Sequence, residues 1–203
     1  VAKIMVVGIT LKSCQKGTGL AEKYSELYAS VGIHPHDAGN CSEKVLHTLE
    51  RLSQSPKACA WGEIGLDFNR MFSSRADQEK WFCRQIEISG KLELPVIFHE
   101  RDSNGRFLDI LNTEFEPGRQ GVVHCFSGNR KELFAYLSMG LYIGITGVLT
   151  IQKRGKHLRQ LVPHIPRDRI LVETDAPFLT PAPEKNRTRR NEPAFVKSVL
   201  LKL

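Results

Sequence analysis

The sequence predicts an α/β fold in which parallel strands alternate with helices, and three observations support that prediction. Short apolar runs alternate with amphipathic stretches about seven times along the chain. These runs are apolar at nearly every residue, which is typical of strands covered by helices on both faces. With 203 residues, 41% of them hydrophobic, the chain can bury a sizeable core, and we expect a single domain over residues 1–203.

The expected strands and helices follow one another in a regular order, and Ser42 is a suitable N-cap for the second helix. The expected strands cover 3–8, 27–33, 58–66, 95–99, 121–126, 141–145 and 169–173, and the expected helices cover 20–27, 42–53, 76–91, 105–112, 130–139, 157–162 and a segment from about Pro193. Both a doubly wound open sheet and a closed (β/α) barrel fit this order, and periodicity alone does not choose between them. No glycine-rich phosphate fingerprint follows the first strand, which disfavours dinucleotide binding.

Composition and charge narrow the classes of function. No apolar run approaches the roughly 20 residues that a membrane-spanning helix needs, and we expect no membrane partner. The five cysteines are widely spaced, odd in number and free of any C-x-x-C pair, which argues against a disulfide framework and favours a reducing, cytoplasmic location. The net charge of +7 favours a polyanionic partner such as nucleic acid, with solubility alone as the other interpretation.

Metal-binding side chains stand where the predicted strands end. Glu63, His99 and His124 each close a different apolar run, and Glu173 or Asp175 closes another. The C-terminal ends of parallel strands open on one face, where barrel enzymes build their active sites. One such residue alone is more often a capping or hydrogen-bonded group, but several on different strands favour a metal site. Imidazole with carboxylate suits Zn²⁺, Mn²⁺ or Fe, a carboxylate-rich site suits Mg²⁺, and such ions can polarise phosphoryl oxygens.

The residues around these positions form seven short motifs, including G-E-I-G-L-D at 62–67 and H-C-F-S-G at 124–128. The others lie at 31–36, 99–101, 142–147, 173–179 and 190–193. In this order they cover nearly the whole chain and resemble the TatD family of metal-dependent deoxyribonucleases, most closely its bacterial members. The resemblance implies a TIM-type (β/α) barrel of the amidohydrolase kind. It also implies that the chain begins at the second strand, so we expect a barrel lacking its first strand and last helix.

The resemblance assigns a role to each candidate residue. It implies metal ligation by Glu63, His99, His124 and Asp175, with Asp175 orienting or deprotonating the attacking water. It places His34 in contact with the scissile phosphate and makes Glu63 and His34 part of the catalytic set. The implied ion is Mg²⁺, with Mn²⁺ or Zn²⁺ as alternatives.

Further side chains have two interpretations each. Arg101 and Arg190 are candidates for substrate phosphate contact, or they pair with a neighbouring acid and anchor the last helix, respectively. Asp67 and Asn69 either orient a ligand or cap their loop, and His36 either reaches the site or only forms a turn. Three aromatic side chains can stack on bases, although core packing is favoured for the last of them: Phe68, Phe72 and Phe126.

The function implied by the resemblance is removal of nucleotides from single-stranded DNA, 3′ to 5′, with RNA as a further substrate, in DNA repair or turnover. Two alternatives remain open. The same metal site can hydrolyse another ester or amide, such as a D-aminoacyl group on transfer RNA, because fold does not determine substrate. A basic chain can also bind nucleic acid without cutting it, although a pure binder has no use for the ligand set. We expect a monomer.

Overall fold

The computed structural model describes residues 1–185 and 190–203. The chain divides into two compact units, Val1–Gly121 and Val122–Leu203. Within each unit parallel strands alternate with helices, as the sequence predicts. The expectation of a single domain over the whole chain stays a prediction.

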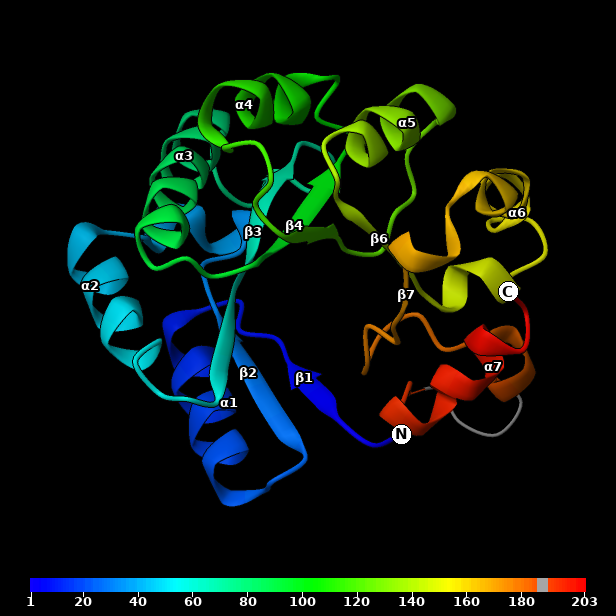
Figure 1. Cartoon of the computed structure of the whole chain (residues 1–203), viewed down its shortest axis with the longest axis horizontal. Coiled ribbons are helices and arrows are strands. Elements are labelled where there is room, and N and C mark those ends of the chain that lie inside the picture. The colour runs from blue at the N-terminus through cyan, green and yellow to red at the C-terminus, as the bar shows by residue number, and fades with distance from the viewer. Residues whose placement is uncertain (186–189) are drawn as a thin grey trace. The chain divides into compact units, whose positions relative to one another are not determined.

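The first unit contains four parallel strands, each paired with the next in chain order. They are β1 (Ile4–Val6), β2 (Leu27–Val31), β3 (Ala58–Asp67) and β4 (Val96–Arg101). The helices that follow them are α1 (Leu11–Lys23), the 3₁₀-helix η1 (Pro35–Asn40), α2 (Glu43–Leu52), α3 (Arg75–Lys91) and α4 (Arg106–Glu114). Figure 1 shows the α-helices of this unit side by side along the outer face of its strands.

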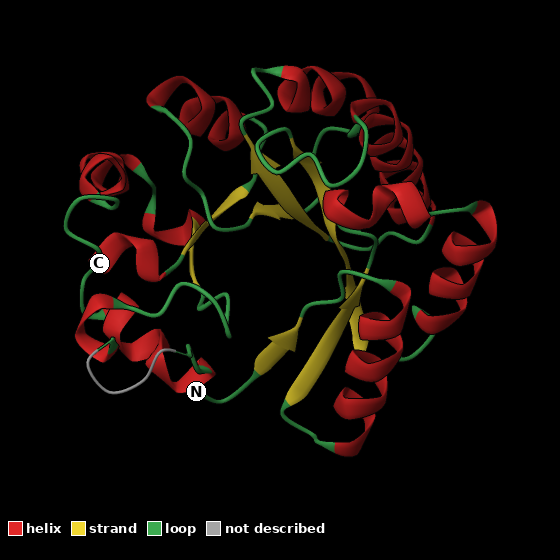
Figure 2. Ribbon diagram, turned by 180° about the vertical axis from the view of Figure 1, so that it is seen from behind, coloured by secondary structure: helices red, strands yellow, loops and turns green. Residues whose placement is uncertain are grey.

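The second unit repeats the pattern with shorter elements. Its strands are β5 (Gly121–Val123), which starts at the unit boundary, β6 (Tyr142–Ile145) and β7 (Ile170–Val172), paired in parallel. Its helices are α5 (Arg130–Ser138), α6 (Lys156–Leu161) and α7 (Val196–Leu200), with the 3₁₀-helices η2 (Gly147–Thr150), η3 (Val162–His164), η4 (Arg167–Arg169), η5 (Ala182–Glu184) and η6 (Pro193–Phe195). Figure 2 shows these short helices separated by loops.

Side-chain caps determine where several helices begin. Ser42 accepts a hydrogen bond from the backbone of Val45, which confirms it as the N-cap of α2. The predicted helix over 20–27 is wrong, because α1 runs from residue 11 to residue 23. Thr10 and Ser13 form a reciprocal capping box at its start. Gly17 and Gly19, which lower helix propensity, obscure its first turns in the sequence pattern.

The predicted burial of the strands on both faces holds best for β3. Every residue of β3 except Cys59 is buried, from Ala58 to Asp67. Against it and β4 lies a cluster of aromatic rings in which Phe82 stacks on Phe107 at 5.2 Å between centroids. Phe98 of β4 meets both rings edge-on. This packing fixes β3 and β4, the two strands that carry Glu63 and His99.

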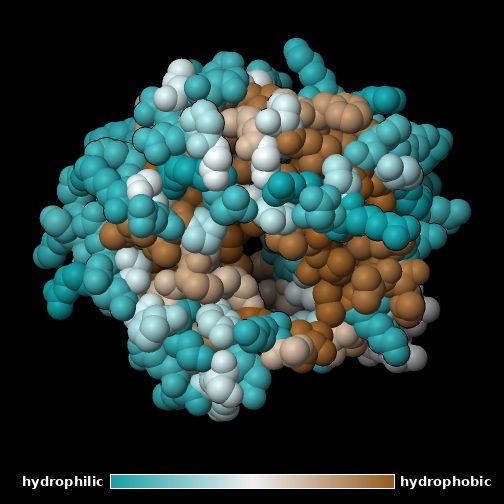
Figure 3. Space-filling model, viewed as in Figure 1, coloured by the Kyte–Doolittle hydropathy of each residue, from teal (hydrophilic) through white to brown (hydrophobic). Residues whose placement is uncertain are grey.

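The surface of the second unit includes exposed leucines near the end of the chain. Figure 3 shows hydrophobic surface in the region where Figure 1 places α7, and Leu200, Leu201 and Leu203 are among the exposed apolar side chains. None of the helices in the described part of the chain is both long enough and apolar enough to cross a membrane.

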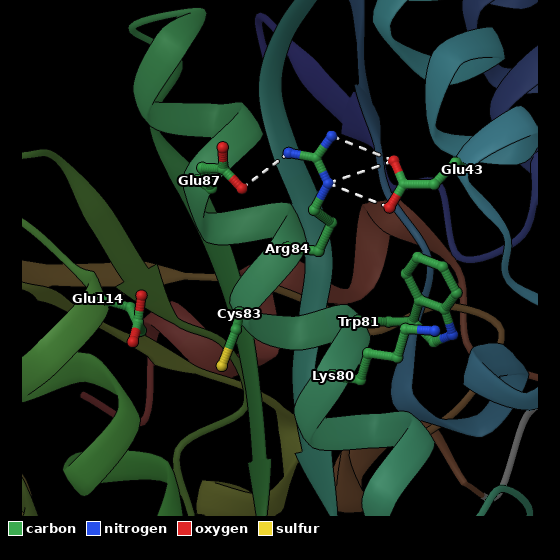
Figure 4. Close-up of a pocket in the computed structure, with 7 residues that line it drawn as sticks. All are labelled: Glu43, Lys80, Trp81, Cys83, Arg84, Glu87 and Glu114. Carbon is green, nitrogen blue, oxygen red and sulfur yellow. Dashed lines mark hydrogen bonds and ion pairs between the residues drawn. The ribbon is translucent and has the colours of Figure 1, made fainter.

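A pocket of about 350 Å³ lies on the helical side of the first unit (Figure 4). Its lining comes from α2, α3 and α4 and comprises Glu43, Lys80, Trp81, Cys83, Arg84, Glu87 and Glu114. Arg84 is bound on two sides, at 3.1 Å from Glu43 and 2.7 Å from Glu87. The pocket contains none of the residues that the sequence suggests for chemistry, so the candidate site lies elsewhere.

Candidate metal centre

An irregular step in β3 positions Glu63. The register between β3 and β4 shifts at Glu63, whose backbone N–H instead donates to the carbonyl of Gly8 at 2.9 Å. Gly62 and Gly65 both have φ near +147°, where side chains are disfavoured. A Cβ on Gly65 would also overlap the carbonyl oxygen of His99. The two glycines therefore allow the backbone conformation that positions the Glu63 side chain.

Three metal-binding side chains meet in the first unit. His34 follows β2, Glu63 lies in β3 and His99 in β4, and one donor atom of each lies within 4.8 Å of the others. His99 Nδ1 is 2.7 Å from Glu63 Oε1, and His34 Nε2 is 3.6 Å from the same oxygen. The sequence predicts Glu63 and His99 as ligands and His34 as a phosphate contact. The structure brings all three together, and their roles stay predictions.

The His99 ring lies between two carboxylates. Its Nδ1 contacts Glu63, and its Nε2 is 3.3 Å from Asp67 Oδ2. Burial opposes the charged ring, but the hydrogen bonds to Asp67 and Glu63 outweigh burial and raise the pKa of His99 to about 9. This surplus of negative charge also favours a bound cation, which must displace the proton from a ligating histidine.

Asp67 caps its own loop, as one interpretation predicts, and it also contacts His99, while its orienting of a metal ligand stays a prediction. Its Oδ2 contacts His36 Nε2 at 2.7 Å as well as His99, and its Oδ1 accepts the backbone N–H groups of Asn69 and Arg70. Burial opposes its charge, yet the hydrogen bonds from His99, Arg70 and His36 hold the pKa of Asp67 below its usual range. The turn after β2 therefore brings the His36 ring to Asp67, and a part for His36 in the site stays a prediction.

Two buried glutamines on α3 hold the loops that carry these side chains, and the sequence analysis missed both. Gln85 Oε1 accepts the N–H of Ile33 at 2.8 Å, and its Nε2 donates to the carbonyl of Ile33 at 3.1 Å. Gln78 makes the same pair of bonds to the backbone of Asp67, at 2.8 and 3.1 Å. The two residues are seven apart and thus share a helix face. The sequence signal that could have revealed them is the pair of side-chain amides seven residues apart on the mostly apolar, buried face of α3.

A second group forms in the second unit. His124 follows β5, and its Nδ1 contacts Glu173 Oε2 at 2.7 Å while its Nε2 lies 3.5 Å from Asp175 Oδ1. The other oxygen of Glu173 accepts the N–H of Cys125 at 2.5 Å. Atoms of His124, Cys125 and Asp175 lie within 4.8 Å of one another. Glu173 thus orients the ring so that Nε2 faces Asp175, as carboxylates behind metal-binding histidines do.

The loop that follows Asp175 is fixed by Asn191. This side chain is 2% exposed, and its Nδ2 donates to the carbonyls of Thr174 at 2.7 Å and Phe178 at 2.6 Å. Its backbone N–H donates to the carbonyl of Pro177 at 3.1 Å. The late R-N-E-P motif therefore has a structural task, which is to hold the turn that carries Asp175.

The four predicted ligands thus fall into two groups, Glu63 with His99 in the first unit and His124 with Asp175 in the second. Arg101 ends β4, and no hydrogen bond or ion pair holds its guanidinium within the described ranges. Arg190 is exposed beside the buried Asn191. Residues 186–189 of the same basic stretch lie outside the described residues.

Comparison with known proteins gives concordant matches over the whole chain. The family model described as TatD related DNase matches residues 1–203. The chain is 41% identical over 199 residues to the 3'-5' ssDNA/RNA exonuclease TatD of Klebsiella pneumoniae (strain 342), covering 97% of this chain and 76% of that protein. It is 39% identical over 202 residues to the protein of that name from Escherichia coli (strain K12), covering 98% and 78%.

Solved structures agree with these matches. A TatD homologue from Escherichia coli K12 superposes with a TM-score of 0.89 at 28% identity, covering 100% of this chain and 77% of that chain. A hydrolase TatD family protein from Entamoeba histolytica gives a TM-score of 0.87 at 27% identity, with coverage of 100% and 77%. The likeness confirms the predicted α/β fold of TIM-barrel type, incomplete and with seven strands among the described residues.

Proposed function

We propose that this chain, which belongs to the TatD-related DNase family, is a metal-dependent exonuclease that digests single-stranded DNA and RNA from the 3′ end. The observation that carries the proposal is the group of His34, Glu63 and His99, whose donor atoms lie within 4.8 Å of one another, with His34 just after β2, Glu63 within β3 and His99 within β4. The names of relatives about 40% identical to it supply the substrate and the polarity.

The donor set fits a divalent cation. In the first unit the Glu63 carboxylate and the His99 imidazole face each other beside His34, and in the second unit an imidazole, a thiol and a carboxylate lie together. Imidazole with carboxylate suits Mn²⁺ or Zn²⁺, and Mg²⁺ binds through few carboxylates while keeping several waters. We take Mg²⁺ as the ion of the proposed enzyme. When bound, it supplies Lewis acidity toward a phosphoryl oxygen and toward water.

In the first unit we distinguish side chains that would bind the cation from one that would donate a hydrogen bond to the substrate phosphate. Glu63 and His99 are the proposed cation ligands. His34 Nδ1 accepts the N–H of His36 at 3.1 Å, so in the neutral ring Nε2 carries the proton. Burial lowers the pKa of His34 and favours this neutral form. Nε2–H, which lies 3.6 Å from Glu63 Oε1, is the proposed donor to an oxygen of the scissile phosphate.

The second unit contributes the proposed base. Asp175 is partly exposed and faces His124 Nε2, which leaves a carboxylate oxygen able to accept a proton from an attacking water. His124 and Asp175 are also proposed cation ligands. Arg101, whose guanidinium has no partner in the described segments, and the exposed Arg190 are the proposed contacts to substrate phosphates.

The test is digestion of a 5′-labelled single-stranded oligonucleotide with Mg²⁺, Mn²⁺ or EDTA. We expect a ladder that shortens from the 3′ end, vanishes with EDTA and falls at least about a hundredfold in Glu63→Gln. Glu116→Gln, an exposed acid between α4 and β5, is the matched control and should keep full activity. Full activity of Glu63→Gln would refute the assignment. A folded chain that binds the oligonucleotide without cutting it would support a non-catalytic binder instead.

The proposed setting is the cytoplasm, with the protein acting as a monomer. All five cysteines are free, which agrees with a reducing compartment. Elution from a calibrated gel-filtration column at the mass of one chain would support the monomer.

A further inference from the structure

The structure separates the three phenylalanines that the sequence suggests for base stacking. Phe126 is 3% exposed and belongs to the core of the second unit. The ring of Phe68 is covered by the guanidinium of Arg75, 4.6 Å from the ring centre. Phe72, in contrast, is 68% exposed. Of these three side chains, Phe72 alone is largely exposed.

Phe72 stands beside the candidate metal group. Its ring meets the His36 ring edge-on, with 4.8 Å between centroids and an interplanar angle of 90°. The His36 ring is in turn 6.0 Å from the ring of His99. These two distances set an upper limit of about 11 Å between the rings of Phe72 and His99. The sugar of one nucleotide can bridge such a gap between a stacked base and a phosphate at the cluster.

The backbone beneath Phe72 is held in place although its ring is exposed. The hydroxyl of Ser73 donates to the carbonyl of His36 at 3.0 Å and accepts the N–H of Gly39 at 2.9 Å. The carbonyl of Ser73 accepts a hydrogen bond from Gln78 at 3.0 Å. Folding therefore holds the backbone next to Phe72 near the cluster, so that the ordering left to oppose the binding of a ligand is mainly that of the side chain.

We propose that Phe72 is a stacking platform for an unpaired nucleobase next to the scissile phosphate. This inference rests on the proposed exonuclease function and deepens it, because it assigns the residue that selects a single-stranded end. Every base has a π-face, so such a platform binds without strong sequence preference. A base inside a duplex is stacked on both faces and cannot use it, whereas a free end can.

The kinetic test compares Phe72→Ala and Phe72→Trp with the wild type. We expect Phe72→Ala to lower kcat/KM on single-stranded DNA roughly ten- to hundredfold, mainly through KM, because stacking on an aromatic side chain contributes at this level. Phe72→Trp should keep the activity. Tyr24→Ala is the matched control, since Tyr24 is a 55% exposed aromatic residue at the end of α1, before β2 begins and thus away from the strand ends of the site.

A spectroscopic test reports stacking directly. Oligonucleotides with 2-aminopurine at successive positions from the 3′ end are bound in EDTA, and we expect the wild type and Phe72→Trp to quench the probe at one position. Phe72→Ala should leave that probe bright at saturating protein.

The outcomes separate the two proposals. Equal kinetics and equal quenching for wild type and Phe72→Ala would overturn the stacking role while leaving the exonuclease intact. Phe72-dependent quenching without any cleavage by the wild type would overturn the exonuclease and keep the platform. A wild type that neither binds nor cuts the strand would overturn both.

Discussion

Replacing Gln85 by methionine removes three hydrogen bonds from the interior of the first unit while nearly preserving side-chain length. Gln85 is 1% exposed. Its Oε1 accepts the N–H of Ile33 at 2.8 Å and the indole Nε1–H of Trp61 at 3.3 Å, and its Nε2 donates to the carbonyl of Ile33 at 3.1 Å. Methionine cannot replace any of these contacts, so two donors and one acceptor lose their partner.

The cost follows from what these groups lose. A buried polar group that loses its partner costs about 1–3 kcal/mol, and the thioether fills most of the vacated space, so a cavity adds little. For three such groups, with the sum reduced because they share one site, we expect Gln85→Met to lower the free energy of unfolding by roughly 3–6 kcal/mol. Domains are typically stable by about 5–15 kcal/mol, so this loss is a large share of that stability and brings a domain at the lower end of the range close to unfolding.

Urea unfolding followed by tryptophan fluorescence measures the change, because Trp61 and Trp81 both belong to the first unit. Gln15→Met, at an exposed position of α1, is the matched control and should shift the midpoint little. A loss below about 1 kcal/mol, the net contribution of one ordinary hydrogen bond, would refute the reasoning. It would mean that water replaces the amide at Ile33.

Three more predictions follow from the same geometry. Gly65→Ala should reduce metal-dependent cleavage at least about tenfold, even in a variant that stays folded. The reason is that the added Cβ would push on the backbone of His99. Unchanged cleavage by a variant with an intact circular dichroism spectrum would contradict this prediction. Glu173→Gln should weaken metal affinity about 10–100-fold by loosening His124, measured by calorimetry with Mn²⁺, and equal affinity would remove the positioning role. Burial raises the pKa of Cys14 to about 11, so its thiol should resist iodoacetamide at pH 8 in mass spectrometry. Because the folded state favours the neutral thiol, its contribution to stability is present below about pH 9 and is lost as the pH rises toward 11; rapid labelling of the native chain would contradict the burial.

The strands and the acid and imidazole side chains at their ends were predictable from the sequence for a physical reason. A strand covered on both faces is mostly apolar, so the run that forms β3 and the Val96–Phe98 run of β4 stand out, and Glu63 or His99 following such residues is conspicuous. The start of α1 was not predictable in the same way. Its buried face consists of Cys14, Gly17, Thr18 and Ala21, which do not form a hydrophobic stripe.

The supporting residues escaped prediction because tertiary neighbours decide their role. Gln78, Gln85 and Asn191 are polar residues that a helix or loop can equally expose to water. The spacing of seven places the two glutamines on one helix face, but it does not show which distant backbone groups they bond. The exposure of Phe72 is of the same kind, since only the fold shows that Arg75 covers Phe68 instead. Sequence patterns thus reveal candidate ligands more readily than the residues that hold those ligands in place.

The register shift at Glu63 in β3 constrains which sequence changes this protein can accept during evolution. Glu63 lies out of register with β4, flanked by Gly62 and Gly65 in conformations that few residues adopt. Removing one residue here would restore regular pairing and at the same time turn the acid toward the opposite face of the sheet. Selection for thermal stability alone does not maintain the position of the acid, so a directed-evolution screen on this scaffold needs activity as a second criterion.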